Sequence, residues 1–253
     1  MSLALDRRAI LVTGAAGGIG RATALILAQA GAHLMLTDIA DGEETVDLIR
    51  ASGGRAEFIQ ADIGSEAEVE SLIARMVEIF GRIDGAFNNA GVEQCAIPLH
   101  EISAEQWQRA MTVDLTGVFF CLKHEIREML KSGVGSIVNT ASALGCVAIP
   151  NASEYIAAKH GVIGLTKAAA ADYGPDNIRV NAVLPGIIQT AMVGRLVGDP
   201  NFAAHFNKLR DRHPIGRFGQ PSEVGETVKW LLSDAASFVT GASLSVDGGY
   251  LAI

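Results

Sequence analysis

"TGAAGGIG", residues 13–20, follows a short apolar run at 9–12 and opens a segment at 19–30 whose apolar residues recur at helical spacing. A strand, a glycine turn and a helix in succession predict a βα unit. Gly14, Gly18 and Gly20 are spaced G-x-x-x-G-x-G, which allows the backbone to turn sharply and to lie close to a pyrophosphate. The start of the following helix offers free N–H groups and a positive dipole to that anion. The stretch therefore predicts a dinucleotide-binding turn.

Strands and helices alternate along most of the remaining chain. Apolar runs predict further strands at 33–38, 56–60, 83–88, 135–140, 179–184 and 243–246. Helical patterns lie between them at 41–51, 65–80, 104–131, 153–173 and 222–233. Strands joined through helices require right-handed crossovers, which predicts a parallel sheet covered on both faces. No repeat or linker divides the chain, so we expect one α/β domain over 1–253, a doubly wound Rossmann-type sheet of about seven strands.

The segment 187–219 breaks this alternation with Pro200, Pro214 and several glycines. It follows a late strand, so we expect it over the carboxyl ends of the sheet, where open α/β folds bind ligands. A substrate lid is the interpretation we favour, and an inert surface excursion is the alternative.

Composition excludes several classes of protein. The 253 residues carry a net charge of -8, whereas a nucleic-acid binder usually presents a basic face. No apolar run approaches the ~18 residues of a membrane span, and the N-terminus runs into a strand rather than a signal peptide. The three cysteines lack C-x-x-C spacing, and the six histidines lack H-x-x-x-H spacing. We expect a cytoplasmic protein without a disulfide framework or a metal site.

Asp38 ends the second predicted strand, at the distance from the glycine turn where a carboxylate can hydrogen-bond the hydroxyls of an adenine ribose. A 2'-phosphate would be repelled there. No arginine occupies Gly17 or Ile39, from which one could neutralise such a phosphate. We therefore predict NAD rather than NADP as the cofactor, the alternative for Asp38 being a turn-forming acid before "DGEE".

"SEYIAAKHG", residues 153–161, places Tyr155 and Lys159 one helical turn apart. A phenol has an ordinary pKa near ~10, and a neighbouring cation lowers that pKa. The pair could form a tuned general acid/base, although Tyr and Lys at this spacing also occur on solvated helices. Other residues must point to the same site.

Those residues are present. With the glycine turn, "NNAG" at 88–91, Ser142 and Tyr155-x-x-x-Lys159 in this order, the chain resembles the short-chain dehydrogenase/reductase family. The resemblance covers almost the entire chain and includes "RVNAVLPG" at 179–186 and "VDGGY" at 246–250. It implies an oxidoreductase that moves a hydride between NAD and a secondary alcohol or ketone.

The resemblance also implies roles for individual residues. Tyr155 would be the general acid/base, Lys159 would lower its pKa and bind the nicotinamide ribose, and Ser142 would hold the substrate oxygen. Asn88 would stabilise the central sheet. The remaining cofactor contacts would be Gly14, Gly18, Ile19 and Gly20 on the pyrophosphate, Asp38 on the ribose, Asp62 and Ile63 on adenine, Asn89 and Ala90 under the adenosine ribose, and Ile188 and Thr190 on the carboxamide. Each of these contacts could instead reflect packing or turn chemistry.

Asp114 departs from the family pattern. In "TVDLTGVFF" it stands where family members usually have an asparagine that kinks the helix and, through its backbone carbonyl, holds a water that relays protons to the lysine. We expect a role through the backbone, with the side chain capping a local backbone donor. The alternative is an ionised carboxylate within reach of Lys159, which would partly cancel the cation that tunes Tyr155.

The substrate should be a cyclic or hydrophobic secondary alcohol, because the residues expected to border it are mostly small or apolar. These are Glu93, Gln94 and Cys95, the stretch 143–147, and the lid around Met192. Several sequence segments also resemble those of cyclic diol and secondary alcohol dehydrogenases: "FNNAGV", "GSIVNTASALG", "HPIGRF" and "LLSDAASFVTG".

Two rival functions remain open. A 3-oxoacyl-carrier-protein reductase would prefer NADPH and could present "KLRDRH", residues 208–213, to an acidic carrier, but Asp38 disfavours that cofactor. A dinucleotide-binding regulator without catalysis is disfavoured by the intact Ser142, Tyr155 and Lys159. The resemblance further implies a homotetramer built through the Tyr155 helix, its neighbour and the C-terminal segment, with "VDGGYLAI" buried near a partner.

Overall fold

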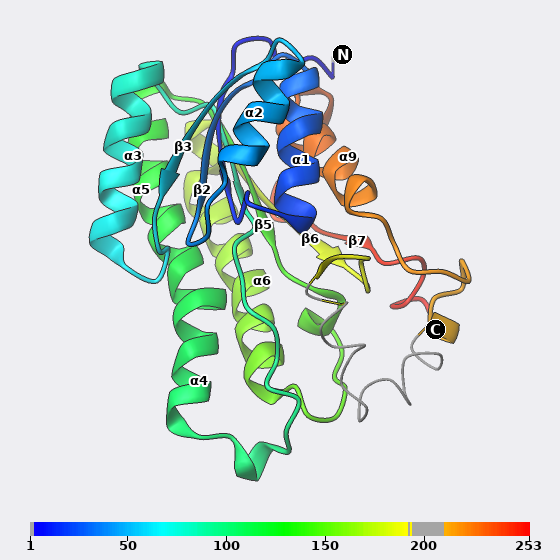
Figure 1. Cartoon of the computed structure of the whole chain (residues 1–253). Helices are drawn as coiled ribbons and strands as arrows, with labels where there is room; N and C mark the ends of the chain where they lie inside the picture. Colours follow the sequence, from blue (N-terminus) through cyan, green and yellow to red (C-terminus); the bar gives the residue numbers. More distant parts are fainter. Residues whose placement is uncertain (1–2, 192, 194–209) are drawn as a thin grey trace.

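Seven parallel strands form a single sheet in the order β3-β2-β1-β4-β5-β6-β7 (Figure 1). The computed structural model describes residues 3–191, 193 and 210–253. The strands are β1 (Ala9–Thr13), β2 (His33–Asp38), β3 (Arg55–Gln60), β4 (Gly85–Asn88), β5 (Gly135–Thr140), β6 (Ile178–Pro185) and β7 (Ser243–Val246). The predicted doubly wound α/β domain is confirmed.

Helices cover both faces of the sheet, as predicted. One layer holds α1 (Gly18–Gln29), α2 (Glu43–Ala51) and α9 (Pro221–Leu232); the other holds α3 (Glu66–Phe80), α5 (Val118–Ser132) and α6 (Ser153–Tyr173), with α4 (Ala104–Met111) extending beyond the sheet (Figure 1). Short helical turns complete the described chain: η1 (Leu99–Glu101), η3 (Ala143–Gly145), η4 (Gly174–Asp176) and η5 (Asp234–Ala236).

Two apolar cores lie on opposite faces of the sheet. In β1, the side chain of Leu11 packs in the core under α3, α5 and α6, whereas Ile10 and Val12 pack in the core under α1, α2 and α9. Successive side chains of a strand point to opposite faces, and a parallel sheet is buried on both. The near-continuous apolar runs of the sequence follow from this arrangement.

From β1 to β3 the chain adds strands toward one edge of the sheet, and from β4 to β7 it adds them toward the other edge. This change of strand order between β1 and β4 opens the crevice where such folds bind ligands. Thr13 ties the two strand ends together, because its Oγ1 accepts the N–H groups of Asn89 at 2.9 Å and Ala90 at 3.0 Å. Gly14 follows directly, and a Cβ at this position would lie 2.8 Å from Asn89 Nδ2. The glycine therefore allows the turn to pass close to the end of β4.

The run 104–131, predicted as one helix, is divided. A π-helical segment, η2 (Thr112–Gly117), separates α4 from α5. Gly117 allows this segment to lie against the loop after β3, because a Cβ there would be 2.9 Å from the side chain of Ile63. Segments of this kind widen a helix locally and often occur at functional sites. Here the segment contains Asp114.

The predicted lid at 187–219 is only partly within the described residues. Its two ends pair with each other, since Ile188 forms a parallel bridge with Gly219 and Ile187 N–H donates to Nε2 of the buried His213 at 3.2 Å. Residue 192 and residues 194–209, which include the expected substrate contact Met192, lie outside the described residues. None of the described helices combines the length and apolarity needed to cross a membrane.

Candidate active site

The glycine turn has the backbone geometry that an anion-binding turn requires. Gly14 and Gly18 have φ of 67° and 53°, in the left-handed region that favours glycine. A Cβ on Gly20 would lie 2.0 Å from the carbonyl oxygen of Gly14. Helix α1 begins at Gly18, has no side-chain cap, and carries no acidic residue in its first turn. Its N–H groups are thus available to a pyrophosphate.

Asp38 joins the end of β2 to this turn. Its Oδ2 accepts the N–H of Ala16 at 3.0 Å, and its Oδ1 accepts the N–H of Ala40 at 3.0 Å. These contacts fix the carboxylate beside the glycine turn, where the predicted adenine ribose would lie. Asp62 is fixed similarly, because its Oδ1 accepts the N–H of Gly64 at 2.8 Å.

A cavity of about 820 Å³ runs along the carboxyl ends of the strands. Its lining includes every predicted catalytic and cofactor-binding residue except Gly20. Of the described residues expected to border the substrate, it includes Gln94, Ala143 and Leu144 but not Glu93, Cys95 or 145–147. Gly20 instead packs beneath the turn, against the Gly14 carbonyl. The glycine turn leaves open a space that side chains would fill, the start of α1 is uncapped, and Asp38 offers a carboxylate. These three features fit a nicotinamide dinucleotide. Gly14, Gly18 and Asp38 lie at one end of the cavity, and Ser142, Tyr155 and Lys159 lie at the other.

Ser142, Tyr155 and Lys159 come from two neighbouring elements. Ser142 follows β5 and caps η3, where its Oγ accepts the N–H of Leu144 at 3.1 Å. Tyr155 and Lys159 lie one turn apart on α6, and Lys159 Nζ is 5.4 Å from the centroid of the Tyr155 ring. The ammonium also donates to the carbonyl oxygen of Thr140 at 3.1 Å. The lysine is therefore held between the end of β5 and the phenol.

The ionisation of Tyr155 is set by opposing effects. Burial raises its pKa, the Lys159 ammonium lowers it, Asp114 raises it, and a hydrogen bond with Ser142 lowers it, leaving the pKa above its ordinary value. Burial alone would lower the pKa of Lys159, but Asp114 and Tyr155 outweigh burial and raise that pKa overall. Lys159 therefore stays a cation beside the phenol.

Asp114 reaches this lysine. Its Oδ1 lies 3.3 Å from Lys159 Nζ and accepts the N–H of Val92 at 3.1 Å, with the side chain 0% exposed. The expectation that the carboxylate caps a backbone donor is met, although Val92 is distant in the chain rather than local. The carboxylate also lies within reach of Lys159, as the alternative requires, and the role through the backbone carbonyl stays a prediction.

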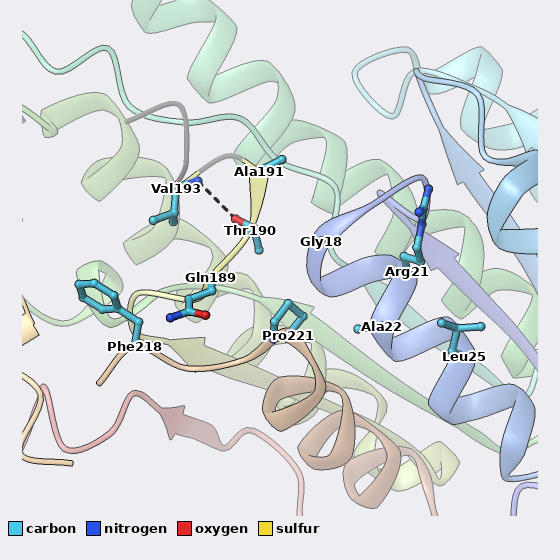
Figure 2. A pocket seen from close by; sticks show the side chains of 10 residues that line it. All are labelled: Gly18, Arg21, Ala22, Leu25, Gln189, Thr190, Ala191, Val193, Phe218 and Pro221. Carbon is cyan, nitrogen blue, oxygen red and sulfur yellow. Dashed lines mark hydrogen bonds between the residues drawn. The ribbon is translucent and has the colours of Figure 1, made fainter. Parts of the chain in front are cut away.

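A second groove of about 640 Å³ adjoins the cavity (Figure 2). Gly18, Ala22 and Leu25 of α1 line one side, and the segment after β6, including Thr190, lines another. Thr190 packs on the glycine turn, because a Cβ at Gly18 would lie 3.4 Å from its methyl group. Both cavities therefore meet where the cofactor was predicted.

Several residues near the site were not predicted as site residues. Arg109, Ile149 and Tyr250 also line the large cavity. Glu154, which is 0% exposed, accepts the N–H of Cys95 through Oε1 at 2.6 Å and so fastens the loop after β4 to the start of α6. Tertiary packing brings Arg109 and Ile149 to the site. Glu154, by contrast, directly precedes Tyr155, and Tyr250 ends the segment "VDGGY", so their places in the sequence could have indicated them.

Comparison with known proteins places the chain in a family. Residues 14–251 match the family model described as enoyl-(acyl carrier protein) reductase. The 2,5-dichloro-2,5-cyclohexadiene-1,4-diol dehydrogenase of Sphingobium indicum is 47% identical over 251 residues, 98% of this chain and 99% of that protein. The cyclohexanol dehydrogenase of an Acinetobacter species is 43% identical over 252 residues, 99% of this chain and 97% of that protein.

Solved structures agree over the whole fold. Carveol dehydrogenase from Mycobacterium avium, in complex with NAD, is 35% identical with a TM-score of 0.93 and covers 98% of this chain and 99% of its own. A putative 2-deoxy-d-gluconate 3-dehydrogenase from Agrobacterium tumefaciens, with bound NADP, is 35% identical with a TM-score of 0.90 and covers 99% of each chain. The chain, an oxidoreductase with the Rossmann-type fold, belongs to the short-chain dehydrogenase/reductase family.

Proposed function

We propose that this protein oxidises a cyclic or otherwise hydrophobic secondary alcohol with NAD, with Tyr155 as the general base. The observation that carries the proposal is the single cavity that contains the glycine turn and Asp38 together with Ser142, Tyr155 and Lys159. Relatives at 43–47% identity are named for a cyclic diol and for cyclohexanol, which supports a cyclic substrate.

The residues of the chain supply orientation and proton transfer. When bound at Gly14, Gly18 and Asp38, a nicotinamide cofactor would supply the acceptor for the hydride that leaves the carbinol carbon. Tyr155, as the phenolate, takes the hydroxyl proton of the alcohol at its Oη, leaving the ketone. Ser142 donates a hydrogen bond to the substrate oxygen and holds it beside the phenol. Lys159, buried and paired, stabilises the phenolate by its charge.

The proposal of NAD rather than NADP rests on the surroundings of Asp38. Its carboxylate lies in the cavity and would repel a 2'-phosphate. Ile39, which follows it, is 66% exposed and provides no charge. Arg21 is a cation near the turn, but it is engaged with Glu44 at 2.7 Å and with Thr45 at 3.0 Å. These contacts favour a structural role for Arg21 over a role as a phosphate ligand.

Asp38→Ala should narrow the preference for NAD over NADP. The variant loses the hydrogen-bond acceptor for the ribose hydroxyls and no longer repels the phosphate, so kcat/KM should fall with NAD and rise with NADP. The check is kcat/KM for both cofactors in the wild type and in Asp38→Asn, which keeps an acceptor without the charge. A wild-type kcat/KM greater with NADP than with NAD would refute this role for the carboxylate.

A cytoplasmic location stays a prediction.

We also propose that the protein is a homotetramer. Large apolar side chains remain exposed on α4 and α5. Trp107 of α4 is 39% exposed, and Phe119 and Leu130 of α5 are 44% and 43% exposed. A partner of the same chain would bury such a surface. Sedimentation velocity at micromolar concentration should give the mass of four chains, and a monomer under those conditions would contradict the proposal.

The function itself is tested by a substrate screen. The purified protein is incubated with NAD or NADP and with cyclohexanol, cyclic diols and open-chain alcohols, while absorbance of the reduced nicotinamide is followed. We expect the highest kcat/KM with a cyclic secondary alcohol and NAD. Faster reduction of a 3-oxoacyl thioester with NADPH would favour the rival reductase, and cofactor binding without turnover of any substrate would favour the regulator.

A further inference from the structure

The catalytic cation has a second partner besides the phenol. Lys159 Nζ lies 3.3 Å from Asp114 Oδ1, and both side chains are nearly inaccessible, with 3% and 0% exposed. Charges buried in this way are screened little by salt and interact strongly. The positive charge that stabilises a Tyr155 phenolate is therefore opposed by the negative charge of an ionised Asp114.

We infer that Asp114 is a positioning residue: its carboxylate holds the Lys159 ammonium and weakens the stabilisation that this ammonium gives to the Tyr155 phenolate. The inference rests on the proposed role of Tyr155 and adds to it a restraint that sets the pH range of oxidation. The asparagine usual at this position in the family carries no such charge.

The local backbone holds Asp114 in this place. The π-helical segment η2 carries it, and the N–H of Val92 fixes Oδ1 from the loop after β4. Gly91 leaves space for the pair, because a Cβ there would be 2.6 Å from Asp114 Oδ1 and 3.5 Å from Lys159 Nζ. Three separate segments thus converge on one carboxylate oxygen.

The other oxygen of Asp114 lacks such a partner, as does one carboxylate oxygen each of Glu125 and Glu154. Oδ2 is buried and has no hydrogen-bond partner among the described residues. A buried carboxylate with one unsatisfied oxygen is costly, and a nearby cation offsets part of that cost. The charged groups that face Asp114 are Lys159 from α6 and, at longer range, Arg109 from α4; Tyr155 faces the same lysine from α6.

The direction of the effect follows from these contacts. Burial raises the pKa of Asp114, while Lys159 and the Val92 N–H oppose that rise. Where Asp114 is ionised, it raises the pKa of Tyr155. Removing the charge therefore lowers the pKa of Tyr155, and the phenolate needed for oxidation forms at lower pH. The rate of alcohol oxidation at neutral pH therefore rises. Ketone reduction needs the protonated phenol, so its rate begins to fall at a lower pH than in the wild type.

Asp114→Asn tests the charge with little change of shape. The amide keeps an oxygen acceptor for Val92 N–H and keeps the backbone unchanged. We expect the apparent pKa of Tyr155, and the acid limb of kcat for alcohol oxidation, to fall by about one unit. Asp114→Ser, which also removes the charge, should shift both quantities in the same direction and replaces the asparagine variant if that variant does not fold.

Two readouts separate this inference from the proposed function. The pH profile of cyclohexanol oxidation with NAD requires turnover, whereas ultraviolet absorbance of the phenolate during alkaline titration does not. The chain has three tyrosines, so subtracting the titration of Tyr155→Phe isolates Tyr155. If the wild type oxidises no alcohol but the phenolate titration of Asp114→Asn still shifts, the proposed function fails while the effect of the Asp114 charge on the Tyr155 phenolate stands.

Glu154→Gln is the matched control. Glu154 is also a buried carboxylate, adjacent to Tyr155, but its Oε1 accepts the N–H of Cys95, whereas Asp114 pairs with the lysine. We expect a smaller shift in this variant than in Asp114→Asn. A phenolate titration of folded Asp114→Asn that superimposes on that of the wild type would overturn the inference, and so would an equal shift in Glu154→Gln.

Discussion

Tyr155→Phe is expected to lower kcat at least about 100-fold while leaving NAD affinity within a few-fold. The phenyl ring fills the same space between Ser142 and Lys159, but it has no hydroxyl to accept the proton of the alcohol. Hydride transfer from an alcohol that cannot lose its proton is strongly disfavoured. The measurements are kcat by absorbance of the reduced nicotinamide and the NAD dissociation constant by calorimetry.

Tyr173→Phe provides the control for this variant. It makes the same substitution on the same helix, at the last residue of α6 and outside the cavity lining. Its kcat should stay close to that of the wild type. If Tyr155→Phe retained more than about a tenth of wild-type turnover, Tyr155 could not be the general base, because such groups contribute about 100-fold or more.

Gly20→Ala is expected to abolish detectable cofactor binding and to lower the free energy of unfolding by about 1–3 kcal/mol. The added Cβ would lie 2.0 Å from the Gly14 carbonyl oxygen and 2.9 Å from Asn89 Nδ2. Backbone atoms cannot give way as a flexible side chain does, so the glycine turn must move away from α1. The N–H groups that would hold the pyrophosphate then lose their alignment.

Gly17→Ala adds the same methyl group to the same turn. Gly17 has an extended backbone that any residue can adopt, and no atom of the described residues lies within 4 Å of its added Cβ. The urea unfolding curve of this variant should match that of the wild type within about 0.5 kcal/mol. Equal stability for Gly20→Ala and Gly17→Ala would show that the close contact under the turn is not rigid.

Much of the fold could be predicted because the relevant signals are local. Apolar runs such as "HLMLTD" mark strands buried on both faces, and β2 covers the predicted residues 33–38. The positive φ angles of Gly14 and Gly18 are a property of short range, so the glycine spacing is visible in the sequence. The order of the motifs then placed the cofactor and the site residues at the carboxyl ends of the strands.

Only part of the surroundings of Asp114 could be predicted: reach to Lys159 is one of the two alternatives that the sequence allows, whereas the contact with Val92 depends on helix geometry and on a distant segment. A regular helix through 104–131 gives a side-chain direction at residue 114 different from that of the π-helical segment. The partners of Asp114, Val92 and Lys159, come from the loop after β4 and from α6. Likewise, Glu154 meets Cys95 only after the sheet has brought β4 and β5 together.

Transfer of deuterium from the carbinol carbon of a cyclic alcohol tests the central claim most directly. Cyclohexanol labelled at that carbon is oxidised with unlabelled NAD, and the reduced cofactor is examined by mass spectrometry for the wild type and for Tyr155→Phe. The account predicts one deuterium in the reduced nicotinamide for the wild type, and no labelled cofactor above background over the same time for the variant. Reduced cofactor without the label, or labelling by the variant at the wild-type rate, would contradict it.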